Sequence, residues 1–326
     1  MTQTLTPGRW RGLKTTSTDQ NVFAILAFDQ RDSYRKMLPA DTSYEAAVQI
    51  KREVVTALSQ ITSAVLLDPT YGLEPALHVA GRCGLLMALE ESGYTGDSTY
   101  RRMAFDADWT VGKIRRMGAS AVKLLVYYHP EAGALTEEIE ALIADICATC
   151  HAYDLPLFVE PVSYSLDAGT PKASVAFAET RPGVVRETAR RLSRLGMDVL
   201  KMEFPVDAAF DDDANRWAAA CAAVSEASAV PWVLLSAGVD FATFERQARA
   251  ACKAGASGFL AGRAIWKEIV PLAPDERQRF LTDVAIPRTE TLCAIASSLA
   301  RPWTDFYAPP PASEDWFRSY AGITAP

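Results

Sequence analysis

Residues 121–128 read Ala-Val-Lys-Leu-Leu-Val-Tyr-Tyr, and residues 199–206 read Val-Leu-Lys-Met-Glu-Phe-Pro-Val. Each stretch is a short apolar run with β-branched residues, which is typical of a strand covered on both faces. Each nevertheless contains a lysine, Lys123 or Lys201. Burying an ammonium group is costly unless the group is paired or its pKa falls. The two stretches therefore indicate buried strands whose lysines have a specific task.

Six more runs of this kind recur along the chain, at 22–29, 64–68, 84–90, 156–161, 232–238 and 257–263. Segments with helical spacing lie between them, among them 44–58, 108–117, 136–152, 184–195, 215–225 and 241–254. Eight repeats of strand and helix, with no break in composition and no G-x-G-x-x-G after the first strand, predict an α/β fold with a single (β/α)8 TIM barrel rather than an open dinucleotide-binding sheet.

The barrel is predicted to occupy residues 21–301. Residues 1–20 form a Thr-rich lead-in, and residues 302–326 form a Pro-rich tail that is either packed by Trp303, Trp316 and Phe317 or mobile.

Composition narrows the class of protein. The 326 residues carry 33 Lys and Arg against 40 Asp and Glu, a net charge of −7 with no basic stripe, so we expect no nucleic-acid partner. No run of apolar residues is long enough to span a membrane, and the first residues do not resemble a secretion signal. We expect a cytoplasmic protein.

The cysteines and histidines predict neither a metal nor a cofactor. Cys147-Ala-Thr-Cys150-His151 matches a haem-attachment pattern, but the same segment also has the apolar spacing of an ordinary helix. We interpret the six cysteines as reduced core residues. His78 and His129 are far from this segment in the sequence, so the three histidines do not form a ligand cluster.

Polar residues at the carboxyl ends of barrel strands are the candidates for chemistry. Glu160 lies on the strand between those of Lys123 and Lys201, where it can transfer protons. A lysine beside a second cation can become a neutral amine that attacks a carbonyl. The alternative is a pair of structural salt bridges, Lys201 with Glu203 and Lys123 with Glu160. Asp29 ends the first run, where it has either a role in the site or the role of a helix cap.

The ends of the last two runs have the composition of a phosphate site. Ser236-Ala-Gly238 and Gly262-Arg263 combine flexible backbone, a hydroxyl and a guanidinium. With an inward lysine, they point to a phosphorylated carbonyl compound. The alternative is that Arg263 pairs with Glu203 or Asp29.

Taken together, these residues resemble the class I tagatose 1,6-bisphosphate aldolases and the related sulfofructose phosphate aldolases. The similarity covers about residues 20–305 and runs through Leu26-Ala-Phe-Asp-Gln-Arg31, Leu66-Leu-Asp-Pro-Thr-Tyr-Gly72, Val122-Lys-Leu-Leu-Val-Tyr-Tyr128, Phe158-Val-Glu-Pro-Val162, Val199-Leu-Lys-Met-Glu-Phe-Pro-Val206, Leu235-Ser-Ala-Gly-Val239 and Gly258-Phe-Leu-Ala-Gly-Arg-Ala-Ile-Trp266.

The resemblance implies a TIM barrel in which Lys201 forms a Schiff base while Lys123 and Glu160 handle protons. It also implies that Asp29, Gln30 and Arg31 contact the sugar. Ser236, Gly238, Gly262 and Arg263 would then hold the phosphate of dihydroxyacetone phosphate.

The activity implied is cleavage of tagatose 1,6-bisphosphate to dihydroxyacetone phosphate and glyceraldehyde 3-phosphate, by a homo-oligomer with a sugar-phosphate substrate. Two alternatives stay open. One is an aldolase for 6-deoxy-6-sulfofructose 1-phosphate, because the C-terminal half is at least as similar to the sulfosugar enzymes. The other is a sugar-phosphate sensor or scaffold without catalysis.

Overall fold

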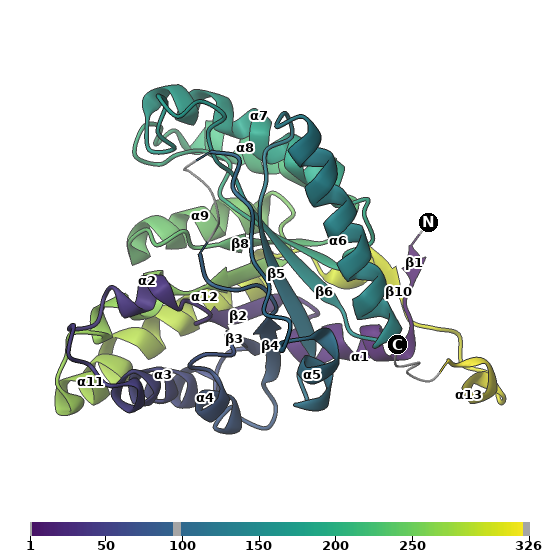
Figure 1. The fold of residues 1–326 in the computed structure, drawn as a ribbon, viewed down its shortest axis with the longest axis horizontal. Coiled ribbons are helices and arrows are strands. Elements are labelled where there is room, and N and C mark those ends of the chain that lie inside the picture. The colour runs from purple at the N-terminus through teal and green to yellow at the C-terminus, as the bar shows by residue number, and fades with distance from the viewer. Residues whose placement is uncertain (1, 94–98, 322–326) are drawn as a thin grey trace.

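In the computed structural model, which describes residues 2–93 and 99–321, eight parallel strands close into one barrel (Figure 1). In order around the barrel the strands are β2 (Phe23–Ala27), β3 (Ala64–Leu67), β4 (Gly84–Ala88), β5 (Ala121–Tyr127), β6 (Leu157–Val162), β7 (Val199–Met202), β8 (Trp232–Leu235) and β9 (Gly258–Ala261). Each strand lies in one of the eight apolar runs, and only β6 extends past its run, by one residue. The predicted TIM barrel is confirmed.

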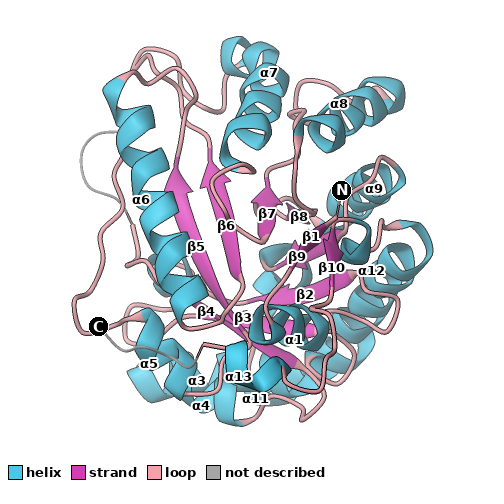
Figure 2. Ribbon diagram, turned by 90° about the vertical axis from the view of Figure 1, so that its right-hand side faces the viewer, coloured by secondary structure: helices cyan, strands magenta, loops and turns pink. Residues whose placement is uncertain are grey.

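Helices surround the strands (Figure 2). Those on the outside are α3 (Tyr44–Leu58), α4 (Leu73–Leu77), α5 (Val111–Arg116), α6 (Ala134–Ala152), α7 (Val175–Leu192), α8 (Ala214–Ala227), α9 (Phe241–Lys253) and α12 (Ile286–Leu299). Shorter helices α2 (Asp32–Arg35), α10 (Arg263–Trp266) and α11 (Pro274–Phe280) lie in the connections, and a π-helical turn, Leu281–Ala285, joins α11 to α12. None of the helices in the described part of the chain could cross a membrane.

Two predicted helices begin three or more residues away from their predicted starts. Helix α7 begins at Val175, nine residues before the predicted start, and contains Pro182, a residue that normally ends a helix. The side chain of Ser174 caps it by accepting from the N–H of Phe177. Helix α5 begins at Val111 rather than at residue 108, because Thr110 caps it.

The lead-in and part of the tail are ordered against the barrel. Helix α1 (Pro7–Thr16) packs so closely at the amino ends of the strands that a Cβ on Gly12 would lie 2.5 Å from the carbonyl oxygen of Ser120. Strand β1 (Gln3–Thr4) pairs in parallel with β10 (Tyr307–Ala308). The three aromatic residues of the tail differ in how far they are buried. Trp303 is fully buried, whereas Trp316 and Phe317 are 45% and 58% exposed, so of the two predicted alternatives the packed tail applies to Trp303 and not to the other two.

The cysteine segment is helical, as its apolar spacing predicts. Cys147 and Cys150 are buried residues of α6, and burial raises the pKa of the Cys147 thiol to about 12. A thiol of that kind stays protonated and unreactive at neutral pH.

Closure of the barrel between β9 and β2 depends on a glycine. Gly258 pairs with Phe23, and its φ of +129° is one that residues with a side chain rarely adopt. A Cβ at this position would lie 1.9 Å from the carbonyl oxygen of Phe23. The contact is with backbone, so neither partner can rotate away.

We expect Gly258→Ala to lower the free energy of unfolding by at least about 2 kcal/mol, through clash and backbone strain at the closing seam. Urea unfolding followed by circular dichroism measures the change. Gly81→Ala is the control, because nothing lies within 4 Å of a Cβ there. Equal stability of the two variants would contradict the closure argument.

Candidate active site

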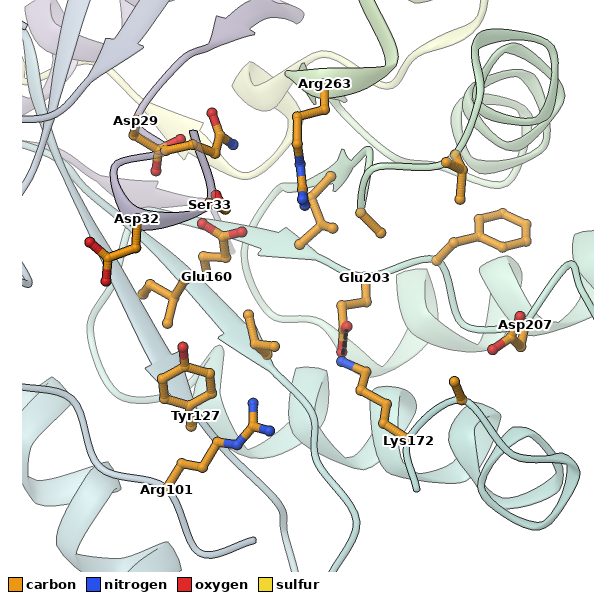
Figure 3. Close-up of a pocket in the computed structure, with 18 of the residues that line it drawn as sticks. Asp29, Asp32, Ser33, Arg101, Tyr127, Glu160, Lys172, Glu203, Asp207 and Arg263 are labelled. Atoms are coloured by element: carbon orange, nitrogen blue, oxygen red, sulfur yellow. Dashed lines mark hydrogen bonds and ion pairs between the residues drawn. The ribbon is translucent and has the colours of Figure 1, made fainter. Parts of the chain in front are cut away.

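The carboxyl ends of the strands open into a cavity of about 970 Å³ (Figure 3). Residues that follow β2, β4, β6, β7 and β9 contribute to its wall, in agreement with the expectation that the chemistry of a barrel lies at this end. The polar side chains that line it include Asp29, Gln30, Arg31, Glu90, Arg101, Lys123, Glu160, Lys172, Arg181, Glu203 and Arg263.

A buried network of lysines and carboxylates forms the floor. Lys123 is 1% exposed, and its Nζ lies 2.8 Å from Asp29 Oδ2, 2.8 Å from Glu90 Oε1 and 2.9 Å from Glu160 Oε2. Lys201 donates to the same Glu160 oxygen at 2.8 Å. The two lysines therefore meet at one carboxylate oxygen, and they come from strands β5 and β7 on either side of β6.

The charges act strongly on one another because water is excluded. Burial by itself would lower the pKa of Lys123, but Asp29, Glu160 and Glu90 together raise it well above its ordinary value. Burial would raise the pKa of Asp29, and Lys123 and Lys201 instead bring it below its usual range. At neutral pH, Lys123 is thus a fixed cation and Asp29 a fixed anion.

Of the two structural salt bridges that the sequence left open, one is confirmed and the other is wrong. Lys123 pairs with Glu160, as expected, but Lys201 does not pair with Glu203. Strand β7 ends at Met202, so Glu203 turns toward the loop after β6. There it accepts from the backbone N–H of Ser163 at 2.8 Å and forms an ion pair with Lys172, as drawn in Figure 3.

Glu203 is also held ionised by its surroundings. Burial would raise the pKa of this carboxyl, but Lys172, Arg181 and the hydrogen bond from the Ser163 hydroxyl lower it to about 2.

Asp29 does not cap a helix. The N-cap of α2 is Arg31, which makes no capping hydrogen bond, while the Asp29 side chain is bound to Lys123. Gln30 lines the cavity, and its buried Oε1 has no partner among the described residues. Arg31 donates to the carbonyl oxygen of Glu90 at 2.7 Å. Gln30 thus has a buried acceptor atom whose hydrogen-bonding capacity is unused among the described residues.

The ends of β8 and β9 lie together as predicted. The N–H of Gly262 donates to Ser236 Oγ at 3.2 Å, and Gly238, with φ +83°, allows the Arg263 guanidinium to pack 3.0 Å from where a Cβ would be. Arg263 lines the cavity, whereas Ser236, Gly238 and Gly262 are not part of its wall. Among the described residues, Arg263 forms no ion pair with either predicted carboxylate, Glu203 or Asp29, so that alternative is wrong.

Several residues that line the cavity are not predicted from the sequence. Lys172 and Arg101 lie in long loops, and the Arg101 guanidinium lies 5.4 Å from the centre of the Tyr127 ring. No periodic pattern marks such positions. Glu90 was detectable, because it ends the third apolar run in the same way that Asp29 ends the first.

No group of three or more His, Cys, Asp and Glu side chains suited to a metal ion occurs within residues 2–93 and 99–321. The charges at the cavity are instead paired. Lys201 lies against the Glu160 carboxylate, and the Arg263 guanidinium lines the same cavity as Glu160.

A family model for DeoC/LacD family aldolases matches residues 23–268, which contain all eight barrel strands. The chain belongs to this aldolase family. It is therefore an enzyme, a lyase, and the alternative of a sensor or scaffold is wrong.

Two tagatose 1,6-diphosphate aldolases are similar to this chain over most of its length. Tagatose 1,6-diphosphate aldolase 1 of Streptococcus pyogenes serotype M3 (strain SSI-1) is 33% identical over 308 residues, which are 88% of this chain and 94% of that protein. Tagatose 1,6-diphosphate aldolase 2 of S. pyogenes serotype M3 (strain ATCC BAA-595 / MGAS315) is 32% identical over 94% of this chain and 99% of its own length.

Solved structures share the fold at low identity. An archaeal fructose 1,6-bisphosphate aldolase has a TM-score of 0.59 and 19% identity, over 88% of this chain and 98% of its own. Fructose-bisphosphate aldolase of Plasmodium falciparum has a TM-score of 0.68 and 13% identity, over 92% and 98% of the two chains.

We expect Arg263→Ala to weaken the binding of inorganic phosphate about tenfold or more, because a charge-assisted and bidentate contact is lost. Isothermal titration calorimetry measures this without reference to turnover. Arg318→Ala is the control, since it removes an exposed guanidinium on α13 (Trp316–Ser319). Equal phosphate affinity in wild type and Arg263→Ala would place the anion elsewhere on the rim.

Proposed function

We propose that this aldolase is a class I enzyme that forms a Schiff base through Lys201. The observation that carries the proposal is that Lys201, which is buried and not itself part of the cavity wall, has its Nζ 2.8 Å from Oε2 of Glu160, and that Glu160 lines the cavity together with Arg263. A carboxylate at that distance can take a proton from the ammonium, which leaves the free amine that attack on a ketone requires.

The proposed substrate is tagatose 1,6-bisphosphate. The Lys201 amine adds to the C2 carbonyl, and loss of water gives an iminium. A base removes the proton of the C4 hydroxyl, the C3–C4 bond breaks, and its electron pair moves into the iminium to give an enamine. Glyceraldehyde 3-phosphate leaves. Protonation at C3 and hydrolysis of the iminium then release dihydroxyacetone phosphate and restore the amine.

The network supports a division of roles. Glu160 is the proton acceptor and donor, since it touches the amine directly. Lys123, fixed as a cation by its three carboxylates, holds Glu160 and Asp29 in place through ion pairs and donates a hydrogen bond to Asp29. Asp29 and Gln30 are assigned to the sugar hydroxyls. Arg263, next to Ser236, Gly238 and Gly262, is assigned to the C1 phosphate, and a tethered phosphate would fix the ketone over Lys201.

The relatives' names support a phosphate at the far end, where Arg31, Arg101 and Lys172 line the wall. One observation favours the second candidate substrate, 6-deoxy-6-sulfofructose 1-phosphate. The charge of Lys172 is already neutralised by Glu203, which suits a singly charged sulfonate better than a doubly charged phosphate.

We expect sodium borohydride with dihydroxyacetone phosphate to inactivate the aldolase by reducing one adduct on Lys201, because hydride addition to the iminium gives a secondary amine that water cannot hydrolyse. Peptide mass spectrometry locates the adduct. Lys201→Met should show neither adduct nor activity, whereas the control Lys253→Met, which removes an exposed lysine of α9, should show both. An adduct on another lysine, or activity that disappears with EDTA and returns with a divalent ion, would refute the proposal.

For the substrate, we expect kcat/KM to be at least tenfold higher for tagatose 1,6-bisphosphate than for 6-deoxy-6-sulfofructose 1-phosphate, a difference of about 1.4 kcal/mol in transition-state binding. Coupled assays for dihydroxyacetone phosphate measure both. A tenfold preference for the sulfonate would reverse the assignment and leave the Schiff-base chemistry intact.

A further inference from the structure

A second buried lysine, outside the cavity, lies under the loop that carries Asp29. Lys51 belongs to α3, and its side chain is 0% exposed, as is the side chain of its partner, Asp68. Lys51 does not line the cavity, and among the described residues its Nζ forms no hydrogen bond or ion pair with a side chain assigned to the reaction. Its role must therefore be sought in what it holds.

The three donors of this ammonium group are all used. Nζ forms an ion pair with Asp68 Oδ2, donates to the carbonyl oxygen of Phe28 at 2.8 Å, and donates to the carbonyl oxygen of Gln30 at 3.2 Å. Phe28 and Gln30 are the two residues that flank Asp29. Lys51 thus binds the backbone immediately before and immediately after the carboxylate that pairs with Lys123.

The position of Lys51 is itself determined on every side. Asp68 Oδ1 accepts from the backbone N–H groups of Thr70 and Tyr71, at 2.9 and 2.8 Å, so the acid cannot rotate away. The rings of Phe28, Tyr34 and Tyr71 surround Nζ at 4.6, 5.4 and 5.5 Å. A charge enclosed in this way has one location available to it.

Stability alone is a poor explanation for such a pair. Taking two charges out of water costs about as much as their attraction returns, and apolar side chains of similar volume often serve equally well. What an apolar pair cannot supply is three directed hydrogen-bond donors at one point. Two of those donors determine the course of the chain through residues 28–30.

We infer that Lys51 is a positioning residue for the aldol reaction. By fixing the backbone on both sides of Asp29, it sets where Lys123 and Glu160 lie, and hence where Glu160 meets Lys201. The inference rests on the proposed function, because it assigns Lys51 a part in the chemistry of that same network.

The chain contains a matched pair at the opposite end of the barrel. Arg9 Nη2 lies 2.7 Å from Asp198 Oδ1, and these side chains are 7% and 0% exposed. Asp198 also accepts from the N–H of Leu157, at the amino end of β6. Removing this pair imposes a similar loss of buried charge on the fold, far from the cavity.

The experiment compares K51M/D68N with R9M/D198N. Both double variants avoid leaving a lone buried charge, which the single substitutions would do. We expect K51M/D68N to fold and to lose about tenfold to a hundredfold in kcat, because a small displacement of reacting groups is costly. Its KM and its affinity for inorganic phosphate should stay within threefold of wild type. The control R9M/D198N should keep its kcat within twofold even if its melting temperature falls further.

A double-mutant cycle tests whether the effect passes through Asp29. In a D29N background, adding K51M/D68N should lower kcat by no more than twofold, because there is no longer an Asp29 carboxylate to position. A full additional loss in that background would show a general structural role and overturn the inference. If K51M/D68N does not fold, K51Q/D68N, which keeps hydrogen bonds across the pair, is measured in the same way.

The outcomes separate the two proposals. If borohydride traps the substrate on Lys201 in wild type and K51M/D68N retains full kcat, the positioning role is wrong and the Schiff-base proposal stands. If no adduct forms on Lys201 in wild type, the proposed function fails, whatever the variants show.

Discussion

The site is organised around one buried cation, Lys123, which requires negatively charged partners. Lys123 lies inside the barrel, where an unpaired ammonium group would be prohibitively costly, and it is surrounded by Asp29, Glu90 and Glu160 from three other strand ends. Those carboxylates would repel one another without it. Counted in ionised form, three cations face three carboxylates on the floor: Lys123, Lys201 and Arg31 against Asp29, Glu90 and Glu160. Removing one member would leave its partners uncompensated among side chains that are largely buried.

The two ends of the barrel use their charged side chains differently. At the amino end, α1 and the Arg9–Asp198 pair close the core, and their charges are used for packing. At the carboxyl end, the charges face a cavity and are available to a ligand. Lys51 and Asp68 connect the two purposes, since they are as buried as the amino-end pair but hold the backbone of the site. The membership of the chain in an aldolase family agrees with this concentration of charge at one end.

Much of this was open to prediction from particular residues. The eight strands were predicted because a strand buried on both faces is a continuous apolar run, and Lys123 and Lys201 stood out as charges within such runs. The alternative pairing of Lys201 with Glu203 is wrong because β7 ends at Met202, after which Glu203 lies against Ser163 in the loop that follows β6. Helix α7 was predicted too short because Pro182 is a poor helix residue whose cost the cap at Ser174 and the packing offset. Lys172 and Arg101 were missed because loop positions carry no periodic signal.

The amino-acid sequence by itself determined the barrel, the end at which the cavity opens and the candidate residues there, among them Lys123, Glu160 and Arg263. These follow from local rules, since apolar runs, helical spacing and glycine positions each act over a few residues. The tertiary structure alone decided which charges meet: that Glu160 is shared by both lysines, that Glu203 belongs to Lys172, and that Lys51 reaches across from α3 to the backbone around Asp29. The strength of an ion pair depends on distance and on the exclusion of water, and both are set by the closure of the whole barrel rather than by neighbours in the sequence.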